Sequence, residues 1–409
     1  MGFHNTAPWS LYVHWPWCIR KCPYCDFNSH PVQRRDAQQP ALDAALESAY
    51  VAALLQDLDT DLARFPFLLA RPVASIFFGG GTPSLASSSA YQRLLDGIRE
   101  RLLLLDEVEI TLEANPGGVD ESHFSGYRAA GINRLSIGVQ SFSTPQLQAL
   151  GRIHSGEMAE RAVKAARVAG FERINIDLMH GLPDQTPALA LEDLRLAQSL
   201  APTHLSWYQL TLEPNTEFYH QPPLLPDEDR LADIQEAGSE WLKLQGWQHY
   251  EVSAWAMPEQ QCQHNLHYWR FGDYLGIGAG AHGKMSWADA TAPGGLWIER
   301  HWKTRQPQAY LKRTTSPQGF VAGRTAIDAA DRPLEFMMNA LRLAEGVLAD
   351  RFEQTTGLAL VQIEPVIDEL KALGLWTEQR DRLACSEQGW RYLNSVLEKF
   401  INKVIHRSA

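Results

Sequence analysis

Three of the five cysteines in the chain lie close together, at positions 18, 22 and 25 in the stretch CIRKCPYC. A disulfide would use two of these thiols and leave the third unpaired. Three soft ligands at one point suit zinc or an iron–sulfur cluster. A structural zinc site usually takes four ligands, often as two pairs, whereas Cys262 and Cys385 stand alone. We therefore expect Cys18, Cys22 and Cys25 to ligate a 4Fe-4S cluster whose fourth iron is open to a small molecule. A zinc-stabilised scaffold is the alternative.

Glycine and polar residues follow several short β-like stretches. The glycines at 79–81 in GGGTP allow positive φ angles and close approach of a ligand to the backbone, although such a triplet alone is more often a tight turn. Four polar residues come at or just past the ends of expected strands, where any one of them could instead be a surface or capping residue. They are Glu113, Gln140, Arg152 and Asp177. Together they offer acceptors for ribose hydroxyls and a cation for a carboxylate.

The elements that must position these residues alternate regularly through the first half of the chain. Strands are expected at 10–17, 73–80, 108–115, 134–141, 173–182 and 204–214, with helical stretches between them such as 41–65 and 155–170. Strand–helix units in series imply parallel strands with right-handed crossovers. Six units fall short of a closed eight-stranded barrel, so we expect a partly open (β/α)6 barrel with its chemistry at the carboxyl ends of the strands.

The pattern loosens after about residue 215. A helix is expected near 227–245, then a Gly-rich stretch, FGDYLGIGAGAHG, and an irregular segment at 285–330. The last stretch is typical of a small winged-helix-like α+β module, with two helices, a short hairpin and a terminal helix. We therefore predict three parts: a core at 1–240, a connecting segment at 241–330, and a helical module at 331–409.

Composition excludes some classes of protein. The formal net charge of −11 speaks against broad nucleic-acid binding, which normally needs a basic face. Few cysteines, no apolar leader and no run of about 18 apolar residues predict a protein of a reducing compartment, the cytoplasm. The start, MGFHNT, matches the short myristoylation pattern, but we interpret it as a lead-in to the first strand.

The cysteine spacing, with the aromatic Tyr24 before the last cysteine and a βα series after it, resembles the radical S-adenosylmethionine superfamily. This resemblance implies a 4Fe-4S cluster on the three cysteines and S-adenosylmethionine chelated to the open iron through its amino and carboxylate groups. In that superfamily, one electron from the cluster cleaves the sulfonium to give a 5′-deoxyadenosyl radical.

The motifs GGGTPSL, EANPG, LSIGVQSF, GRIH and DLMHGLPDQT narrow the resemblance to the branch that holds oxygen-independent coproporphyrinogen III oxidase and the HemW heme chaperones. The oxidase has a further cysteine two positions after the third ligand, where this chain has Phe27. The HemW type carries H-N-x-x-Y-W, and this chain has HNLHYW at 264–269. Both features favour a heme chaperone over an active oxidase, which stays the alternative. Trp15 departs from the aliphatic residue usual before the proline.

The resemblance also assigns residues and partners. It places Tyr12, Tyr24, Gly80 and Glu113 at the cluster-bound S-adenosylmethionine. Gly81, Thr82, Gln140, Arg152, Asp177 and Thr211 would line the same cavity, where the oxidase holds a second S-adenosylmethionine. Heme and heme-accepting proteins, including respiratory and membrane-associated ones, are the implied partners.

The stretch around HNLHYW is where we expect the heme. His264 is the first candidate for an axial iron ligand and Cys262 the second, with Tyr268 and Trp269 as aromatic neighbours. The competing interpretation is that His264 is a hydrogen-bonded structural residue that anchors this segment to the barrel.

Overall fold

The computed structural model describes residues 7–32 and 42–405, so the MGFHNT stretch lies outside the described residues. The strands are β1 (Trp9–Trp15), β2 (Trp17–Cys18), β3 (His30–Pro31), β4 (Val73–Gly80), β5 (Leu104–Ala114), β6 (Arg134–Gln140), β7 (Arg173–His180), β8 (His204–Gln209), β9 (Gln248–Glu251), β10 (Ala254–Ala256), β11 (Tyr274–Ile277), β12 (His282–Ala288), β13 (Leu296–Lys303), β14 (Val321–Ala326), β15 (Val347–Leu348) and β16 (Arg382–Leu383).

The helices alternate with these strands through the first half and dominate the end of the chain. They are α1 (Ala44–Arg64), α2 (Ser88–Arg99), α3 (Gly118–Ala130), α4 (Thr144–Ala149), α5 (Gly156–Val168), α6 (Pro187–Ser199), α7 (Glu217–His220), α8 (Glu228–Leu244), α9 (Gln263–Trp269), α10 (Pro307–Lys312), α11 (Arg332–Ala340), α12 (Asp350–Thr356), α13 (Glu364–Ala372), α14 (Glu387–Arg391) and α15 (Leu393–Ile405).

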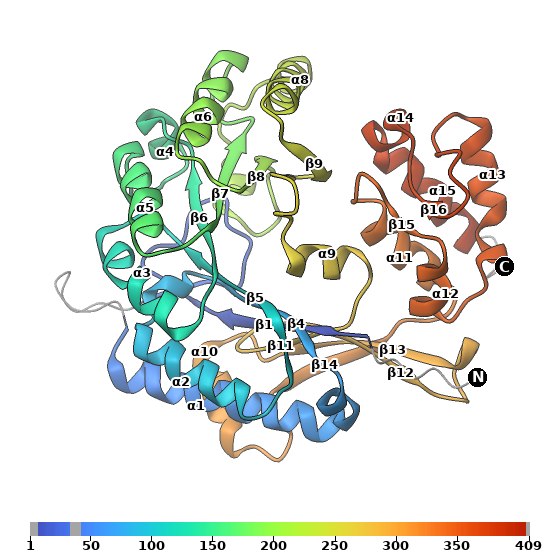
Figure 1. Ribbon diagram of the computed structural model, residues 1–409, viewed down its shortest axis with the longest axis horizontal. Helices are drawn as coiled ribbons and strands as arrows, with labels where there is room; N and C mark the ends of the chain where they lie inside the picture. Colours follow the sequence, from blue (N-terminus) through green and yellow to red (C-terminus); the bar gives the residue numbers. More distant parts are fainter. Residues whose placement is uncertain (1–6, 33–41, 406–409) are drawn as a thin grey trace.

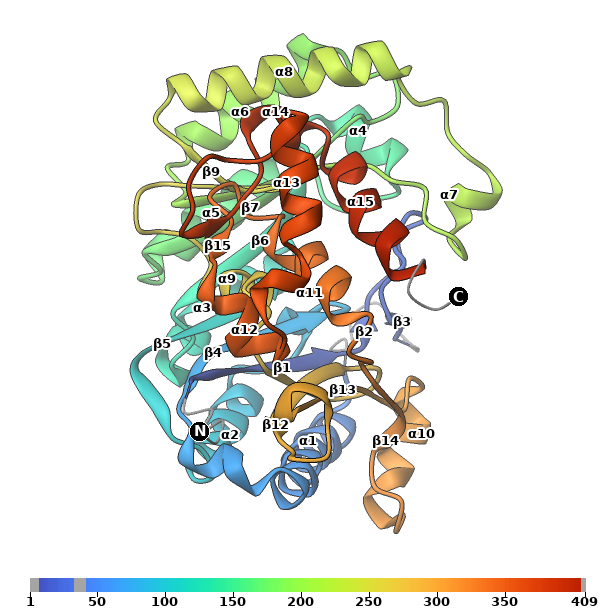
Figure 2. The same ribbon diagram turned by 90° about the vertical axis from the view of Figure 1, so that its right-hand side faces the viewer.

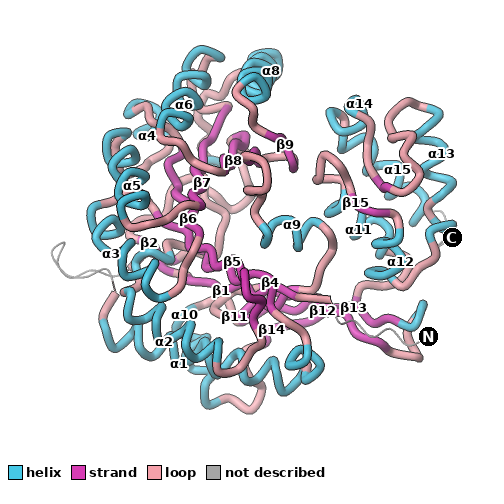
Figure 3. Tube along the Cα trace, viewed as in Figure 1, coloured by secondary structure: helices cyan, strands magenta, loops and turns pink. Residues whose placement is uncertain are grey.

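The central sheet confirms the expected α/β architecture. Within the described residues, twelve strands form one sheet in the order β14-β13-β12-β11-β1-β4-β5-β6-β7-β8-β10-β9. The six expected strands, β1 and β4 to β8, are parallel neighbours in chain order. The sheet curves, and helices of the βα units cover its outer side (Figures 1 and 3). The result is an open, mainly parallel barrel whose strand ends converge.

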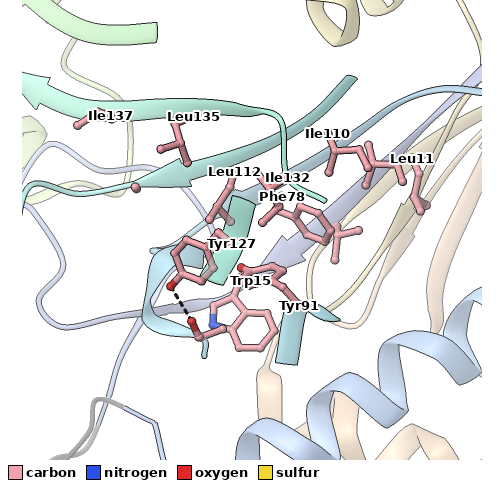
Figure 4. Close-up of a cluster of buried hydrophobic side chains, with 14 of the residues drawn as sticks. Leu11, Trp15, Phe78, Tyr91, Ile110, Leu112, Tyr127, Ile132, Leu135 and Ile137 are labelled. Carbon is pink, nitrogen blue, oxygen red and sulfur yellow. Dashed lines mark hydrogen bonds between the residues drawn. The ribbon is translucent and has the colours of Figure 1, made fainter. Parts of the chain in front are cut away.

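Alternation along the strands decides which side chains face the helices and which face the barrel interior. One buried apolar cluster joins strand residues to α2 and α3, and it includes Leu11, Phe78, Leu112, Leu135, Tyr91 and Tyr127 (Figure 4). Residues that alternate with these carry polar groups, such as Ser75 on β4 and Glu109 on β5. The inner side of the barrel therefore carries polar groups, together with aromatic rings such as that of Phe77.

The segment 285–330 differs from the irregular stretch expected from sequence. It contributes β13, β14 and most of β12, which pair antiparallel and extend the sheet beyond β11. Its anchor is Lys303, whose buried ammonium group lies 2.6 Å from Asp57 and 2.5 Å from Asp61 of α1. These contacts join residues more than 240 positions apart, so the local pattern did not indicate them.

The last part of the chain forms a smaller module with its own apolar core, built from α11 to α15 and the β15–β16 pair. The module lies across the open side of the sheet (Figures 1 and 2). Arg332 joins it to the sheet extension, because its guanidinium donates to the carbonyl oxygens of Leu296 and Thr356, both at 2.9 Å. None of the helices in residues 7–32 and 42–405 combines the length and apolar character that crossing a membrane needs.

Candidate cofactor site

The three clustered cysteines lie in the loop between β1 and α1. All three are free thiols; Cys18 is buried at the end of β2, and Cys22 and Cys25 are half-buried. Burial raises the pKa of Cys18 to about 11, although a hydrogen bond with Thr82 opposes the shift. Across the described ranges, no three His, Cys, Asp or Glu side chains are placed to grip a single metal ion. The donor set suits an iron–sulfur cluster, because each ligated iron takes its own thiolate.

Arg152 lies directly beside this loop. Its Nη1 donates to Cys22 Sγ at 3.6 Å, while Nη2 donates to Asn115 Oδ1 at 2.7 Å and to the Gly138 carbonyl at 2.8 Å. Burial disfavours the charged guanidinium, but Tyr24 and Cys22 reverse the effect and raise the pKa of Arg152. A fixed positive charge therefore faces the cysteine loop. A cluster with anionic thiolates fits such a site.

Gly80, the last residue of β4, and Gly81, which follows it, approach their neighbours too closely for any side chain. Gly80 has a φ of +120°, and a Cβ there would lie 2.6 Å from the His14 imidazole. A Cβ on Gly81 would lie 2.5 Å from the Trp17 carbonyl oxygen. The Gly80 N–H donates to Glu113 Oε2 at 3.1 Å. The glycine triplet thus places backbone without side chains beside the cysteine loop.

Glu113 and Tyr12 both lie beside Gly79, where an added Cβ would come within 3.2 Å of Glu113 and 3.1 Å of Tyr12. Burial, with a smaller effect from the nearby Asp177, raises the pKa of Glu113 to about 8. His14 Nε2 donates to the Asn28 carbonyl at 2.9 Å, so its Nδ1 accepts the Tyr12 hydroxyl at 3.0 Å. This chain of bonds holds the cysteine loop against β1.

The remaining predicted residues fall into two groups. Asp177 accepts from Ser136 at 3.1 Å and from Asn175 at 2.7 Å, and burial raises its pKa. Gln140, in a left-handed conformation with a φ of 68°, accepts from the Tyr208 hydroxyl at 2.8 Å. Thr211, by contrast, lies exposed and donates to Glu213 at 2.9 Å. The structure therefore gathers most of the predicted set at the strand ends and leaves Thr211 at its edge.

Two further residues belong to this group but were missed from the sequence. Asn115 donates to Thr82 Oγ1 at 2.9 Å and accepts from Arg152, so it joins two predicted residues. Tyr208 holds Gln140. Both occupy strand ends, in EANP and WYQ, and that position was the available signal. We call this set of residues the mouth site. Its members are Tyr12, Cys18, Cys22, Tyr24, Cys25, Gly80, Gly81, Thr82, Glu113, Asn115, Gln140, Arg152, Asp177 and Tyr208.

The HNLHYW stretch forms α9, which lies against β4 and β1 on one side and α11 on the other. Glu109 of β5 holds the start of this helix: its Oε1 accepts from Cys262 Sγ at 3.4 Å and from the His264 backbone N–H at 3.2 Å. Its other oxygen lies 2.9 Å from Arg173 and 4.0 Å from Arg134. A buried ionic cluster thus caps the helix from a distant strand.

The side chain of His264 points into the barrel. Its Nδ1 lies 3.0 Å from Ser75 Oγ, and its ring stacks on Phe77 with centroids 5.0 Å apart. Since the Ser75 hydroxyl donates to Ser10, it accepts from His264, and the lone pair of the imidazole is then on Nε2. Burial lowers the pKa of His264 to about 3 and raises that of Cys262 to about 12. His264 is therefore a neutral imidazole, and Cys262 a protonated thiol.

Comparisons with known proteins agree with this architecture. Residues 12–197 match the family model of the radical SAM superfamily, and residues 327–392 match the HemN C-terminal domain. The heme chaperone HemW of Escherichia coli is 50% identical over 97% of this chain and 99% of its own length. That of Haemophilus influenzae is 47% identical over 98% of this chain and 99% of its own length. The mouse radical S-adenosyl methionine domain-containing protein 1, mitochondrial, is 34% identical over 95% of this chain and 86% of its own length.

Among solved structures, the coproporphyrinogen III oxidase HemN of Escherichia coli, a radical SAM enzyme, superposes with a TM-score of 0.76. The match covers 96% of this chain and 90% of that enzyme at 23% sequence identity. At this identity the likeness shows a common fold.

Proposed function

Since the chain belongs to the HemW family within the radical S-adenosylmethionine superfamily, we propose that it binds heme and delivers it to acceptor proteins. The observation that carries the proposal is the 50% identity to a heme chaperone over nearly the full length of both chains. The HNLHYW stretch and the absence of a fourth clustered cysteine, with Phe27 in its place, support the same reading. Phe27 is 62% exposed beside the cysteine loop.

The mouth site is the proposed location of the cofactors. Cys18, Cys22 and Cys25 would hold a 4Fe-4S cluster, which supplies an open iron for S-adenosylmethionine and an electron for cleaving its sulfonium. The Arg152 guanidinium, which donates to Cys22 Sγ at 3.6 Å, would stabilise the negative charge of a cluster held there.

The other mouth-site residues would receive S-adenosylmethionine. Gly80 and Gly81 leave space for the methionine end beside bare backbone. Glu113 and Asp177 offer carboxylate oxygens to its ammonium and ribose hydroxyl groups. Gln140 and Thr82 would complete the wall, and Thr211 would touch the ligand at the edge.

We propose further that heme binds at the segment around α9. We also propose that the chain is divided into a core (1–240), a signature and connecting segment (241–330) and a C-terminal module (331–409). The acceptors would be heme proteins, including respiratory and membrane-associated ones, met in the cytoplasm. The predicted iron ligands are His264, whose Nε2 lone pair is available, and Cys262, whose thiol is buried against Glu109.

The test is anaerobic reconstitution of the full chain followed by heme titration and transfer to a heme-free acceptor protein. We expect saturable heme binding and loss of heme to the acceptor. His264→Ala and Cys262→Ala should be compared with His220→Ala, an exposed histidine of α7. Turnover of coproporphyrinogen to protoporphyrinogen under reducing conditions would favour the oxidase instead.

A further inference from the structure

The face of α9 that points away from the barrel lines a cavity of about 630 Å³. Gln263, Leu266 and Arg270 line it from the helix, at i, i+3 and i+7, so they share one face. The other walls come from β9, from the segments that lead into α9 and β15, and from β16, which pairs with β15. We call this space the outer cavity; its walls are Gln248, His249, Tyr250, Glu259, Gln261, Leu343, Glu345, Gly346 and Arg382, with the three helix residues.

Arg270 enters the outer cavity without a partner. Within the described chain, its guanidinium makes no hydrogen bond or ion pair, and the neighbouring Arg382 adds to burial in lowering its pKa. Arg351, whose Nε donates to the Arg270 carbonyl at 3.1 Å, lies close enough that Arg270 also lowers its pKa. Arg270 is thus repelled by both Arg382 and Arg351 and attracted by Glu345, and an anion in the cavity would relieve the repulsion.

Arg382 is already held in place. Its Nε donates to the Glu345 carbonyl at 2.7 Å, and the carboxylate of Glu345 lies 3.7 Å from Nη2. That carboxylate is 89% exposed, so water screens it and its attraction is weak. Glu259 is the other acidic residue at the wall. Arg270 is exposed and Arg382 is half-buried, so both guanidinium groups are open to a ligand that enters the cavity.

The remaining walls supply an imidazole, that of His249, beside Tyr250. His249 stacks on Trp255 with centroids 4.0 Å apart and meets the edge of Trp390 at 4.6 Å. Burial lowers the pKa of His249 to about 4, so the imidazole is neutral. Its single hydrogen bond is a long contact of 3.4 Å between Nε2 and the Val252 carbonyl. Leu266 and Leu343 add apolar surface.

We infer that the outer cavity is the docking site of heme, with Arg270 and Arg382 paired to the two propionate carboxylates. Guanidinium groups bind carboxylates through paired charge-assisted hydrogen bonds. In this position the imidazole that faces the iron is that of His249, which replaces the iron ligands His264 and Cys262 predicted from the sequence. His264 then stays inside the barrel as an anchor of α9. This inference rests on the proposed heme-binding function and specifies its location.

The test compares heme with heme dimethyl ester, in which both propionates are uncharged. The reconstituted full chain should bind heme at least about tenfold more tightly than the ester, as lost charge-assisted bonds require. Arg270→Gln with Arg382→Gln should weaken heme binding by about the same factor and leave binding of the ester unchanged. Arg391→Gln, an exposed arginine of the same module, is the matched control. His249→Ala should change the absorption bands of bound heme.

Each outcome is decisive. If the unaltered protein binds heme and ester equally and the double variant keeps full affinity, the outer cavity is not the site, although heme binding itself stands. Unchanged bands in His249→Ala together with altered bands in His264→Ala would place the iron inside the barrel and overturn the inference. Absence of heme binding by the unaltered protein would remove the proposed function as well.

Discussion

The mouth site and the outer cavity both contain arginines, but the surroundings of these arginines differ. In the mouth site, Arg152 donates to a thiol, a side-chain oxygen and a backbone carbonyl, so its position is fixed before any ligand arrives. In the outer cavity, Arg270 has no such partner among the described residues and is repelled by Arg382. The first arrangement suits a resident cofactor, because the protein supplies every contact of the charge. The second arrangement suits a ligand that is bound and then released.

Helix α9 separates these two environments. Glu109, Ser75 and Phe77 fix its inner face, whereas its outer face borders the cavity. A heme chaperone must release its ligand, so a site formed by a few charges at the junction of two modules is better suited to transfer than a site inside the barrel.

The largest expected effect concerns the mouth site. Changing Cys18, Cys22 and Cys25 to Ala should abolish bound iron and acid-labile sulfide and remove the absorption near about 400 nm after anaerobic reconstitution. Cys385→Ala and Cys262→Ala should keep the cluster. Full iron and sulfide in the triple variant would show that the mouth site holds no cluster on these thiols, and the comparison with the outer cavity would lose its basis.

Removal of Glu109 tests the wall between the two sites. Glu109→Ala leaves Arg134 and Arg173 without their carboxylate and α9 without its cap, so we expect the free energy of unfolding to fall by about 3–5 kcal/mol. Asp96→Ala, which breaks an exposed pair with Arg99, should cost at most about 1 kcal/mol. Denaturant unfolding measures both. Equal losses would mean that the buried cluster contributes no more than a surface pair.

Single truncations in the mouth site should weaken S-adenosylmethionine binding. Those of Arg152 and Asp177 should also lower stability, because each leaves buried hydrogen-bond partners unsatisfied. Glu113→Ala, Arg152→Ala and Asp177→Ala each remove a group that we expect to hydrogen-bond the charged ligand. Such a bond contributes about 1.5–3 kcal/mol, or at least about tenfold in affinity. Calorimetry measures the change, with Glu160→Ala, which breaks a pair with Lys164 on α5, as control. Unchanged affinity in all three variants would show that these residues have a structural role only and do not bind S-adenosylmethionine.

The pH dependence of stability offers a finer test of the same site. The pKa of Glu113 is raised to about 8 in the folded chain, while in the unfolded chain it is about 4.3. The folded state therefore retains a proton that the unfolded state loses, and stability falls as pH rises between these values.

Glu113→Gln does not titrate, so its melting temperature without cofactors should exceed that of the unaltered protein above about pH 8. The difference should shrink as the pH falls toward about 4.3. Thermal melts across this range measure the effect. A difference that does not depend on pH would show that Glu113 is ionised in the folded protein. The buried Glu113 carboxylate would then need a partner within the mouth site even without a bound ligand.

Several features of this protein followed from the sequence by itself. The six βα strands, the spacing of the cysteines and the placement of Glu113 and Asp177 at strand ends are local patterns. A parallel sheet brings strand ends together whatever the loops contain. These patterns were enough to identify the fold and to assemble most of the mouth site.

Only the tertiary structure decided the rest. Glu109 caps α9 from 155 positions away, and Lys303 anchors the sheet extension to a helix more than 240 positions distant. The outer cavity needs Arg270 of one module beside Arg382 of another. The sequence placed His264 in a promising motif, but the face of α9 that it occupies depends on contacts with Ser75 and Phe77. Such contacts have no local signature, because they arise only when packing brings distant segments together.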